Sequence, residues 1–255
     1  MSPTFRYAIS GSALLLWAEK AAEGSNRTGK AMISADHLRR IAIWASALGD
    51  SEIEVARTGI TEKAFAPNEF ICMRGDRFEY WTGVVAGLVR VGTVSSAGKA
   101  VTFTGLTAGA WFGEGSMLKD ETRRYDAVAL RDSRIALMDR TTFNWLVENS
   151  VGFNRFLVAQ LNERVGHFMG LLEYGRMLDP TARLARCIAS LFNPILYPDG
   201  TRQLEITQEE IGALSGMSRQ NANRCLKTLE KQGVLRLEYG GLTILDLEGL
   251  RRYGE

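Results

Sequence analysis

The pattern of hydrophobic and polar residues divides the chain into a β-type segment followed by helical segments. From about Thr61 to Asp139, short apolar runs rich in β-branched residues are separated by glycine, serine or asparagine, which predicts strands joined by turns. Regularly spaced runs of this kind favour a closed or double-sheet β architecture. Within this segment we find no helical periodicity, and it returns from Thr141.

A long helix is predicted after the β-type segment by an apolar seam at helical spacing. Its members recur every three or four residues: Leu157, Leu161, Val165, Phe168 and Leu172. The helix should run to about Leu178, where Asp179-Pro180 provides an N-cap and a first-position proline for the next helix. Such a helix far exceeds the usual length of about 11–12 residues. It must bury its seam, either against its own β segment or against the same helix of a second chain.

A helix-turn-helix is predicted near the C-terminus by capping signals. Thr207 and Glu210 have the spacing of a capping box, which opens a short helix that Gly216 ends. Ser218 is then the N-cap of a second helix over residues 219–232, and its position also suits a phosphate contact. Two short helices joined by a glycine turn are typical of this motif.

The second of these helices is amphipathic. At about 100° per residue, its long polar side chains fall within an arc of about 140°: Arg219, Gln220, Asn223, Arg224 and Lys227. The opposite side is apolar, with Ala222, Cys225, Leu226 and Leu229. From Ser215 to Arg236, five positive residues against one acidic residue give a local charge of +4. Two β-type runs around Gly240-Gly241 then predict a hairpin, or wing.

This polar face carries the residue types that bind DNA. Arg219 and Arg224 suit guanine, because a guanidinium bonds O6 and N7 together, and Gln220 suits adenine. Asn223 is expected at a base or a phosphate, and Lys227 at the phosphate backbone.

Composition changes this picture only slightly. The 255 residues have room for two domains, and the net charge of +2 means that any DNA-binding charge must be local. Three separated cysteines, Cys72, Cys187 and Cys225, argue against disulfides and for a reducing cytoplasm. No nucleophile–base arrangement or metal-ligand spacing is evident, so we expect no enzyme and no metal site. Residues 1–31 have a flexible-linker composition, and we hypothesise that Met32 is the native initiator or that they are a loose extension.

Three motifs together resemble those of the CRP/FNR family of transcription regulators, named after the cyclic-AMP receptor protein and the fumarate–nitrate reduction regulator. They are GAWFGE at 109–114, RRYDA at 123–127, and TQEEIG at 207–212 running into Ser218-Arg219. The resemblance implies an α+β chain with an N-terminal cyclic-nucleotide-binding-type β-roll (a double-sheet jelly roll), a long dimerisation helix and a C-terminal winged helix-turn-helix.

On this basis we expect an extension at 1–36, a β-roll sensor domain at 37–148, a dimerisation helix at 149–178 and a DNA-binding domain at 179–255. The implied partners are double-stranded DNA, a second copy of the chain, and RNA polymerase. A nucleotide-binding regulatory subunit that uses the β-roll without DNA is the alternative.

The resemblance also places an effector pocket. Glu114, which follows Gly113, corresponds to the glutamate that binds the ribose hydroxyl of cyclic AMP, and Arg124 corresponds to the arginine at the cyclic phosphate. Tyr125 replaces the serine beside that arginine, and hydroxyl side chains that meet the adenine are replaced by Phe168-Met169. A missing partner for a buried polar group costs about 1–3 kcal/mol, so cyclic-AMP binding should be weakened.

Three interpretations of the pocket stay open. Glu114 and Arg124 form a structural ion pair without a ligand, or they bind another effector such as cyclic di-GMP, or cyclic AMP binds despite the substitutions. The iron–sulfur mechanism of some family members is not expected, because residues 1–71 contain no cysteine. His37 and His167 are expected to be ordinary residues rather than haem ligands. Gln220 stands where cyclic-AMP receptors have glutamate, which predicts a half-site that differs from theirs at one base.

Overall fold

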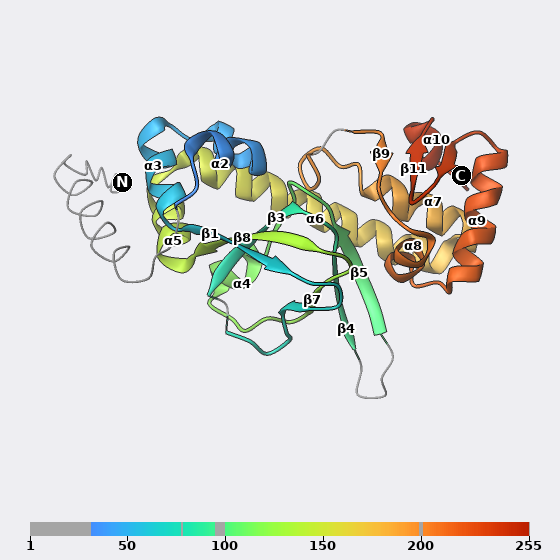
Figure 1. The fold of residues 1–255 in the computed structure, drawn as a ribbon, viewed down its shortest axis with the longest axis horizontal. Helices are drawn as coiled ribbons and strands as arrows, with labels where there is room; N and C mark the ends of the chain where they lie inside the picture. Colours follow the sequence, from blue (N-terminus) through green and yellow to red (C-terminus); the bar gives the residue numbers. More distant parts are fainter. Residues whose placement is uncertain (1–31, 78, 95–99, 199–200, 255) are drawn as a thin grey trace, which may run out of the picture.

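The computed structural model describes residues 32–77, 79–94, 100–198 and 201–254. The expected extension at 1–31, with the hypothesis on the initiator, lies outside them. The β-roll lies at the centre of the molecule, the long helix α6 runs past it, and the C-terminal domain lies at the far end of that helix (Figure 1).

Three short helices precede the first strand: α2 (Ala35–Ile41), the 3-10 helix η1 (Ile43–Ala47) and α3 (Asp50–Thr58). Helix α2 begins two residues before the expected domain boundary, where the Ser34 hydroxyl accepts a hydrogen bond from the His37 backbone N–H. These helices pack on a cluster of aromatic side chains, in which Trp44 lies 5.3 Å from Trp81 between ring centroids.

The β-roll consists of two four-stranded antiparallel sheets, as the sequence predicts. The first contains, in spatial order, β1 (Ile60–Phe65), β8 (Ser133–Asp139), β3 (Tyr80–Ala86) and β6 (Trp111–Phe112). The second contains β2 (Phe70–Cys72), β7 (Asp126–Ala129), β4 (Val89–Val94) and β5 (Ala100–Leu106). One short helix, α4 (Glu114–Lys119), interrupts the strands, and the absence of helix expected between residues 61 and 139 is therefore wrong at this point.

Helices α5 (Arg140–Asn149) and α6 (Val151–Met177) follow the β-roll, and α6 has two different apolar faces. Phe153 and Leu157 are buried in the core of their own chain. A second set of apolar side chains, which we call the outward stripe, is largely exposed: Val151, Val158, Val165, Phe168, Met169 and Leu172. The predicted seam is therefore divided, because Leu157 serves the β-roll while Val165, Phe168 and Leu172 face outward.

The C-terminal domain contains α7 (Pro180–Ser190), β9 (Gln203–Leu204), α8 (Gln208–Ser215), α9 (Arg219–Lys231), β10 (Leu235–Glu238), β11 (Gly241–Ile244) and α10 (Leu247–Arg251). The Asp179 side chain caps α7 by accepting from the backbone N–H groups of Thr181 and Ala182, as predicted. One apolar cluster runs from the sheets of the β-roll into this domain, so the two domains share a continuous core.

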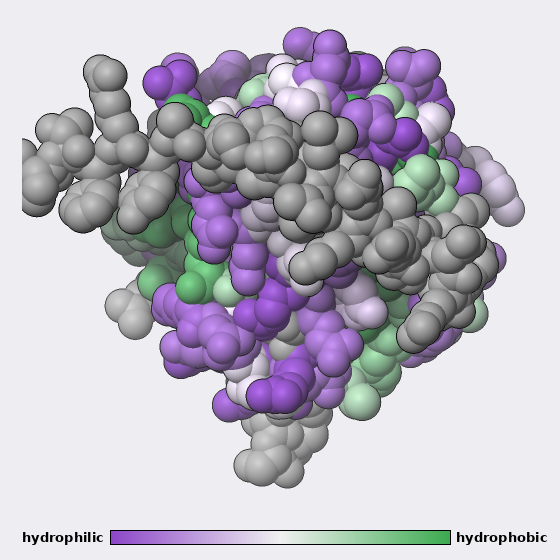
Figure 2. All heavy atoms as spheres, turned by 90° about the vertical axis from the view of Figure 1, so that its left-hand side faces the viewer, coloured by the Kyte–Doolittle hydropathy of each residue, from purple (hydrophilic) through white to green (hydrophobic). Residues whose placement is uncertain are grey.

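Figure 2 views the molecule from the end that carries α3 and α5, where hydrophilic side chains cover most of the described surface and hydrophobic ones gather toward the sides. In the part of the chain that the structure describes, no helix combines the length and apolar character needed to span a membrane.

Candidate DNA-binding surface and sensor pocket

Helix α8 begins with the capping box that the sequence predicts. The Thr207 hydroxyl accepts from the Glu210 backbone N–H at 3.2 Å, and Glu210 accepts from the Thr207 backbone N–H at 2.6 Å. Gly216 ends the helix in the left-handed conformation, at φ 66°, which favours glycine. The turn that follows sets the angle between α8 and α9.

Helix α9 presents a polar face to solvent. The Ser218 hydroxyl caps it by accepting from the Asn221 backbone N–H at 3.3 Å. The four residues of its apolar side are buried: Ala222, Cys225, Leu226 and Leu229. These contacts fix the rotation of the helix, so its polar face must point away from the protein.

The structure places five of the six predicted DNA-binding residues at this exposed surface: Ser218, Arg219, Gln220, Arg224 and Lys227. Asn223 is half-buried at the edge of the face, and its Oδ1 is a buried atom without a hydrogen-bond donor among the described residues. Asn221, which the projection left out, is exposed and accepts a hydrogen bond from Arg224 at 3.4 Å. In the helical projection Asn221 lies next to Arg224, and this position is the sequence signal that could have identified it.

The wing forms as predicted. Glu238 pairs with Gly241, so Tyr239 and Gly240 make the two-residue turn of the hairpin. Tyr239 is fully exposed at the tip. The Glu230 carboxylate at the end of α9 accepts from the Leu237 backbone N–H at 2.7 Å, which ties the wing to the helix.

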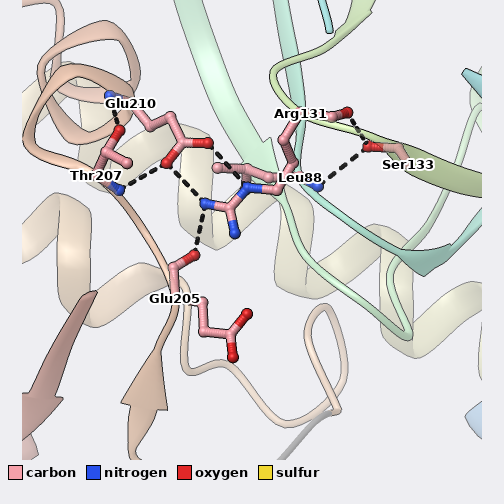
Figure 3. A network of polar contacts seen from close by, with 6 residues as sticks. All are labelled: Leu88, Arg131, Ser133, Glu205, Thr207 and Glu210. Carbon is pink, nitrogen blue, oxygen red and sulfur yellow. Dashed lines mark hydrogen bonds and ion pairs between the residues drawn. The ribbon is translucent and has the colours of Figure 1, made fainter. Parts of the chain in front are cut away.

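An ion pair joins the helix-turn-helix to the β-roll (Figure 3). Arg131, in the loop between β7 and β8, donates to both carboxylate oxygens of Glu210 at 2.9 and 2.7 Å, and to the Glu205 carbonyl at 2.7 Å. We call Arg131, Glu205 and Glu210 the latch. Glu210 therefore serves both the capping box and the contact between domains.

The latch also affects the charge of Glu210. Burial disfavours the ionised carboxylate, but the hydrogen bonds from Arg131 and Thr207 outweigh burial and lower its pKa below the ordinary value. Glu210 is therefore ionised at neutral pH, as the bidentate contact requires.

Glu114 of the predicted effector pocket lies where α4 and β6 meet α6. Gly113 has φ 100°, a conformation that favours glycine, and it turns the chain into α4 so that Glu114 points inward. The buried Glu114 carboxylate is 2.6 Å from Nε of Arg164, which lies on α6. Arg164 also donates to the Trp111 carbonyl, as does the buried Gln160 at 2.6 Å. We call Glu114, Gln160 and Arg164, with the Trp111 carbonyl, the sensor pocket.

The proposed Glu114–Arg124 ion pair is not formed. The side chain of Arg124 is 78% exposed and pairs with Glu121 at 2.9 Å. Its neighbour Arg123 is buried and donates to the Tyr80 carbonyl and the Thr82 hydroxyl. Of these two adjacent arginines, only Arg123 enters the β-roll. The partner of Glu114 comes from α6 instead, a contact that no local signal revealed.

Of the remaining predicted pocket residues, Tyr125 lies close enough to Glu114 and Arg164 for their charges to affect the pKa of its hydroxyl, whereas Phe168 and Met169 lie elsewhere on α6. Tyr125 is half-buried against the apolar core, and burial raises the pKa of its hydroxyl to about 12 despite the opposing charge of Arg123. Phe168 and Met169 are exposed on the outward stripe of α6, at 41% and 66%. They do not contact Glu114 within one chain.

The cysteines and histidines do not gather at one site. Cys72, Cys187 and Cys225 are unpaired thiols. His37 contacts the Glu62 carboxylate, and His167 lies on α6. Among the described residues, no group of three potential metal ligands comes together.

Two family models match the chain, and they divide it as the fold does. Residues 62–150 match the cyclic nucleotide-binding domain, and residues 182–253 match the Crp-like helix-turn-helix domain.

Named relatives are transcription regulators. The chain is 30% identical over 156 residues to the cAMP-activated global transcriptional regulator CRP of Haemophilus influenzae, covering 60% of this chain and 69% of that protein. It is 27% identical to the transcriptional regulator LdrP of Thermus thermophilus, covering 74% of this chain and 95% of that one.

Solved structures share the fold. FixK2 from Bradyrhizobium japonicum has a TM-score of 0.62 at 20% identity, over 75% of this chain and 95% of its own. The c-di-GMP responsive regulator CLP of Xanthomonas campestris has a TM-score of 0.56 at 20% identity, over 77% and 99%. With the matched domains and the regulator relatives, these findings identify the chain as a member of the CRP/FNR family of transcription regulators.

Proposed function

We propose that two copies of this chain bind a pseudo-palindromic DNA site through their α9 helices and thereby regulate transcription. The observation that carries the proposal is the exposed polar face of α9, held outward by four buried apolar residues and capped by Ser218. Guanidinium, amide and ammonium groups on one exposed helix face suit base edges and phosphates together.

Arg219 and Arg224 are proposed to bind guanine, Gln220 adenine, and Lys227 the phosphate backbone. Asn223 is a weaker candidate for base contact, because its side chain is half-buried. Two residues of the wing are further candidates for contacts beside the major groove: Tyr239, which is fully exposed, and Arg236, which is exposed and pairs with Glu238.

Pairing of the α6 helices is supported by the spacing of its exposed stripe. Val151, Val158, Val165 and Leu172 recur every seven residues and are 58–68% exposed. A seven-residue repeat of β-branched or leucine side chains is typical of a two-stranded coiled coil. Pairing along α6 would bury this stripe and place two α9 helices for major grooves about 34–36 Å apart.

The dimer is tested by Val165→Asp, which places a charge in the middle of the proposed seam. We expect sedimentation to show monomers, and DNA affinity to fall at least about a hundredfold because one half-site contact is lost. Glu173→Gln, an exposed change on the same helix outside the seven-residue repeat, is the control. A Val165→Asp protein that stays dimeric would contradict this arrangement.

DNA recognition is tested by selection from random sequences with the purified protein, followed by affinity measurements at one stated salt concentration. We expect a two-fold symmetric site, with a half-site that differs from that of cyclic-AMP receptors at the base facing Gln220. Arg219→Ala and Arg224→Ala should each cost about 1–3 kcal/mol per half-site. Failure to select any sequence would favour the alternative, a regulatory subunit that uses only the β-roll.

For the sensor pocket, we propose that a cyclic nucleotide binds weakly or requires rearrangement. Glu114 is already paired with Arg164, and Arg123 is held by Tyr80 and Thr82. A nucleotide would have to replace these contacts. Affinity measured with cyclic AMP and with cyclic di-GMP tests this, and tight binding of either one without loss of the Glu114–Arg164 pair would contradict it.

A further inference from the structure

The latch constrains the angle between the helix-turn-helix and the β-roll more strictly than the apolar core between them does. Apolar contacts are not directional, whereas a guanidinium that donates to both oxygens of one carboxylate tolerates little rotation. Arg131 makes this contact with Glu210, and it also donates to the Glu205 carbonyl, between β9 and α8 (Figure 3). The Arg131 and Glu210 side chains are 29% and 11% exposed, so solvent screens their pairing less than that of a surface ion pair.

Two further hydrogen bonds join the domains beside the latch. The Thr102 hydroxyl of β5 donates to the Ala213 carbonyl of α8 at 2.6 Å. The buried hydroxyls of Thr104, also on β5, and Tyr197 are 2.8 Å apart. Because Glu210 and Ala213 both belong to α8, the β-roll holds this helix at two points along its length.

Helix α8 passes its orientation on to α9. Ile211 and Leu214 of α8 are buried in the same apolar cluster as Leu226 and Leu229 of α9, so the two helices pack as one unit. The latch contacts α8 and the segment before it, and the exposed residues of the polar face of α9 are not among its members. Docking on the β-roll therefore orients α9 without covering its polar face.

The chain connection between α6 and the C-terminal domain is short. Helix α6 ends at Met177 and α7 begins at Pro180, so residues 178–179 link them. On palindromic DNA the two α9 helices must enter major grooves one helical turn apart, which requires each domain to be held at a suitable angle. A domain without the latch would sample several angles, and only a fraction of them would fit both half-sites at once.

We propose that Arg131 of the β-roll is a positioning residue for DNA recognition. Through Glu210 it sets the angle at which α9 meets the DNA, and thereby the half-site spacing that the dimer accepts. This inference rests on the proposed function, the binding of a palindromic site by two copies of the chain. Arg131 acts through Glu210 and needs no contact with DNA.

The test compares the selected palindrome with the same palindrome carrying one extra base pair between its half-sites, using the full chain. The insertion turns one half-site by about 35° and moves it by about 3.4 Å relative to the other. The wild type should bind the altered site at least about tenfold more weakly. For Arg131→Ala, affinity for the original palindrome should fall about three- to tenfold, and the penalty for the insertion should shrink to less than about threefold.

Two more variants separate positioning from charge. Arg134→Ala removes the same charge from β8, where the side chain is 54% exposed, and it should behave as the wild type at both sites. Thr102→Val removes the hydrogen bond to Ala213, and its spacing preference should change in the same direction as that of Arg131→Ala, by less. All variants should bind an isolated half-site equally well, and thermal unfolding checks that each one is folded.

Equal penalties for the insertion in the wild type and in Arg131→Ala would overturn the positioning role. So would an Arg131→Ala protein that loses as much affinity for the isolated half-site as for the palindrome, because the change would then lie within one domain's own contacts. A wild-type protein that selects no palindrome would contradict the proposed function itself, and the positioning role with it.

Discussion

The polar face of α9 and the sensor pocket both depend on charged side chains, yet they use them in opposite ways. On the polar face of α9 the side chains of Arg219, Arg224 and Lys227 are exposed, and Arg224 donates one long hydrogen bond to Asn221, at 3.4 Å. In the sensor pocket Glu114 is buried and its ion pair with Arg164 is 2.6 Å long. The exposed surface keeps its charges available to a partner, whereas the pocket uses them to hold α6 against the β-roll.

The largest effect is expected when the Glu114–Arg164 ion pair of the sensor pocket is broken while α9 is left unchanged. Arg164→Met removes the partner of a buried carboxylate, which should lower the free energy of unfolding by about 3–5 kcal/mol. Urea unfolding measures this. Arg155→Met, the same change at an exposed position of α6, is the control. In the double variant Glu114→Leu/Arg164→Met most of the stability should return, and an additive loss would argue against the pair.

The next effect concerns the latch, where a charged group of the β-roll contacts the domain that carries α9. Arg131→Ala removes three hydrogen bonds to the C-terminal domain, at a cost of about 1–3 kcal/mol to the contact between the domains. Hydrogen exchange of β5 and α8 amides should become faster. Arg134→Ala, a change at an exposed position on the neighbouring strand β8, should leave hydrogen exchange in α8 unaltered. If Arg134→Ala speeds exchange in α8 as much as Arg131→Ala does, loss of the latch is not the cause of the faster exchange.

A pH measurement sharpens the comparison for a buried group on α6. The pKa of His167 is about 4 in the folded chain against 6.5 ordinarily, so the unfolded chain takes up its proton first. Stability should therefore decrease as the pH falls from about 6.5 toward 4, by on the order of 1–2 kcal/mol. The His167→Gln variant should lose less free energy of unfolding over the same pH range. Identical pH profiles for the variant and the wild type would show that His167 is not responsible.

The smallest effect is expected at Arg124. Its side chain is 78% exposed, so Arg124→Ala should change the free energy of unfolding by less than about 0.5 kcal/mol. Arg123→Ala, which empties a buried position, should cost several times more in the same denaturation experiment. A reversed order would show that the pocket takes the other arginine.

The sequence predicts the helix-turn-helix well because its determinants are local. Thr207 and Glu210 are three residues apart, and the buried and exposed sides of α9 follow from helical periodicity alone. The edge of that face does not follow from periodicity, because Asn223 is half-buried and Asn221 is exposed. Only the tertiary packing decides which of the two is exposed.

The sensor pocket is harder to predict because its contacts are long-range. Glu114 and Arg164 are separated by 50 residues. No local sequence feature shows that a charged residue on a long helix points inward. Arg123 and Arg124 are alike in chemistry, so sequence spacing alone did not show which one enters the β-roll. The division of the α6 seam has the same origin, since Leu157 and Leu161 are equivalent in the pattern but not in the fold.

The double role of Glu210 gives the molecule an intrinsic spectroscopic marker. Its Oε2 accepts both from the Thr207 backbone N–H and from Arg131, so the start of α8 and the docking of its domain share one oxygen atom. An amide proton shifts in frequency as its hydrogen bond shortens or lengthens. The Thr207 amide resonance would therefore report how fully the C-terminal domain is docked on the β-roll, with no label attached to either.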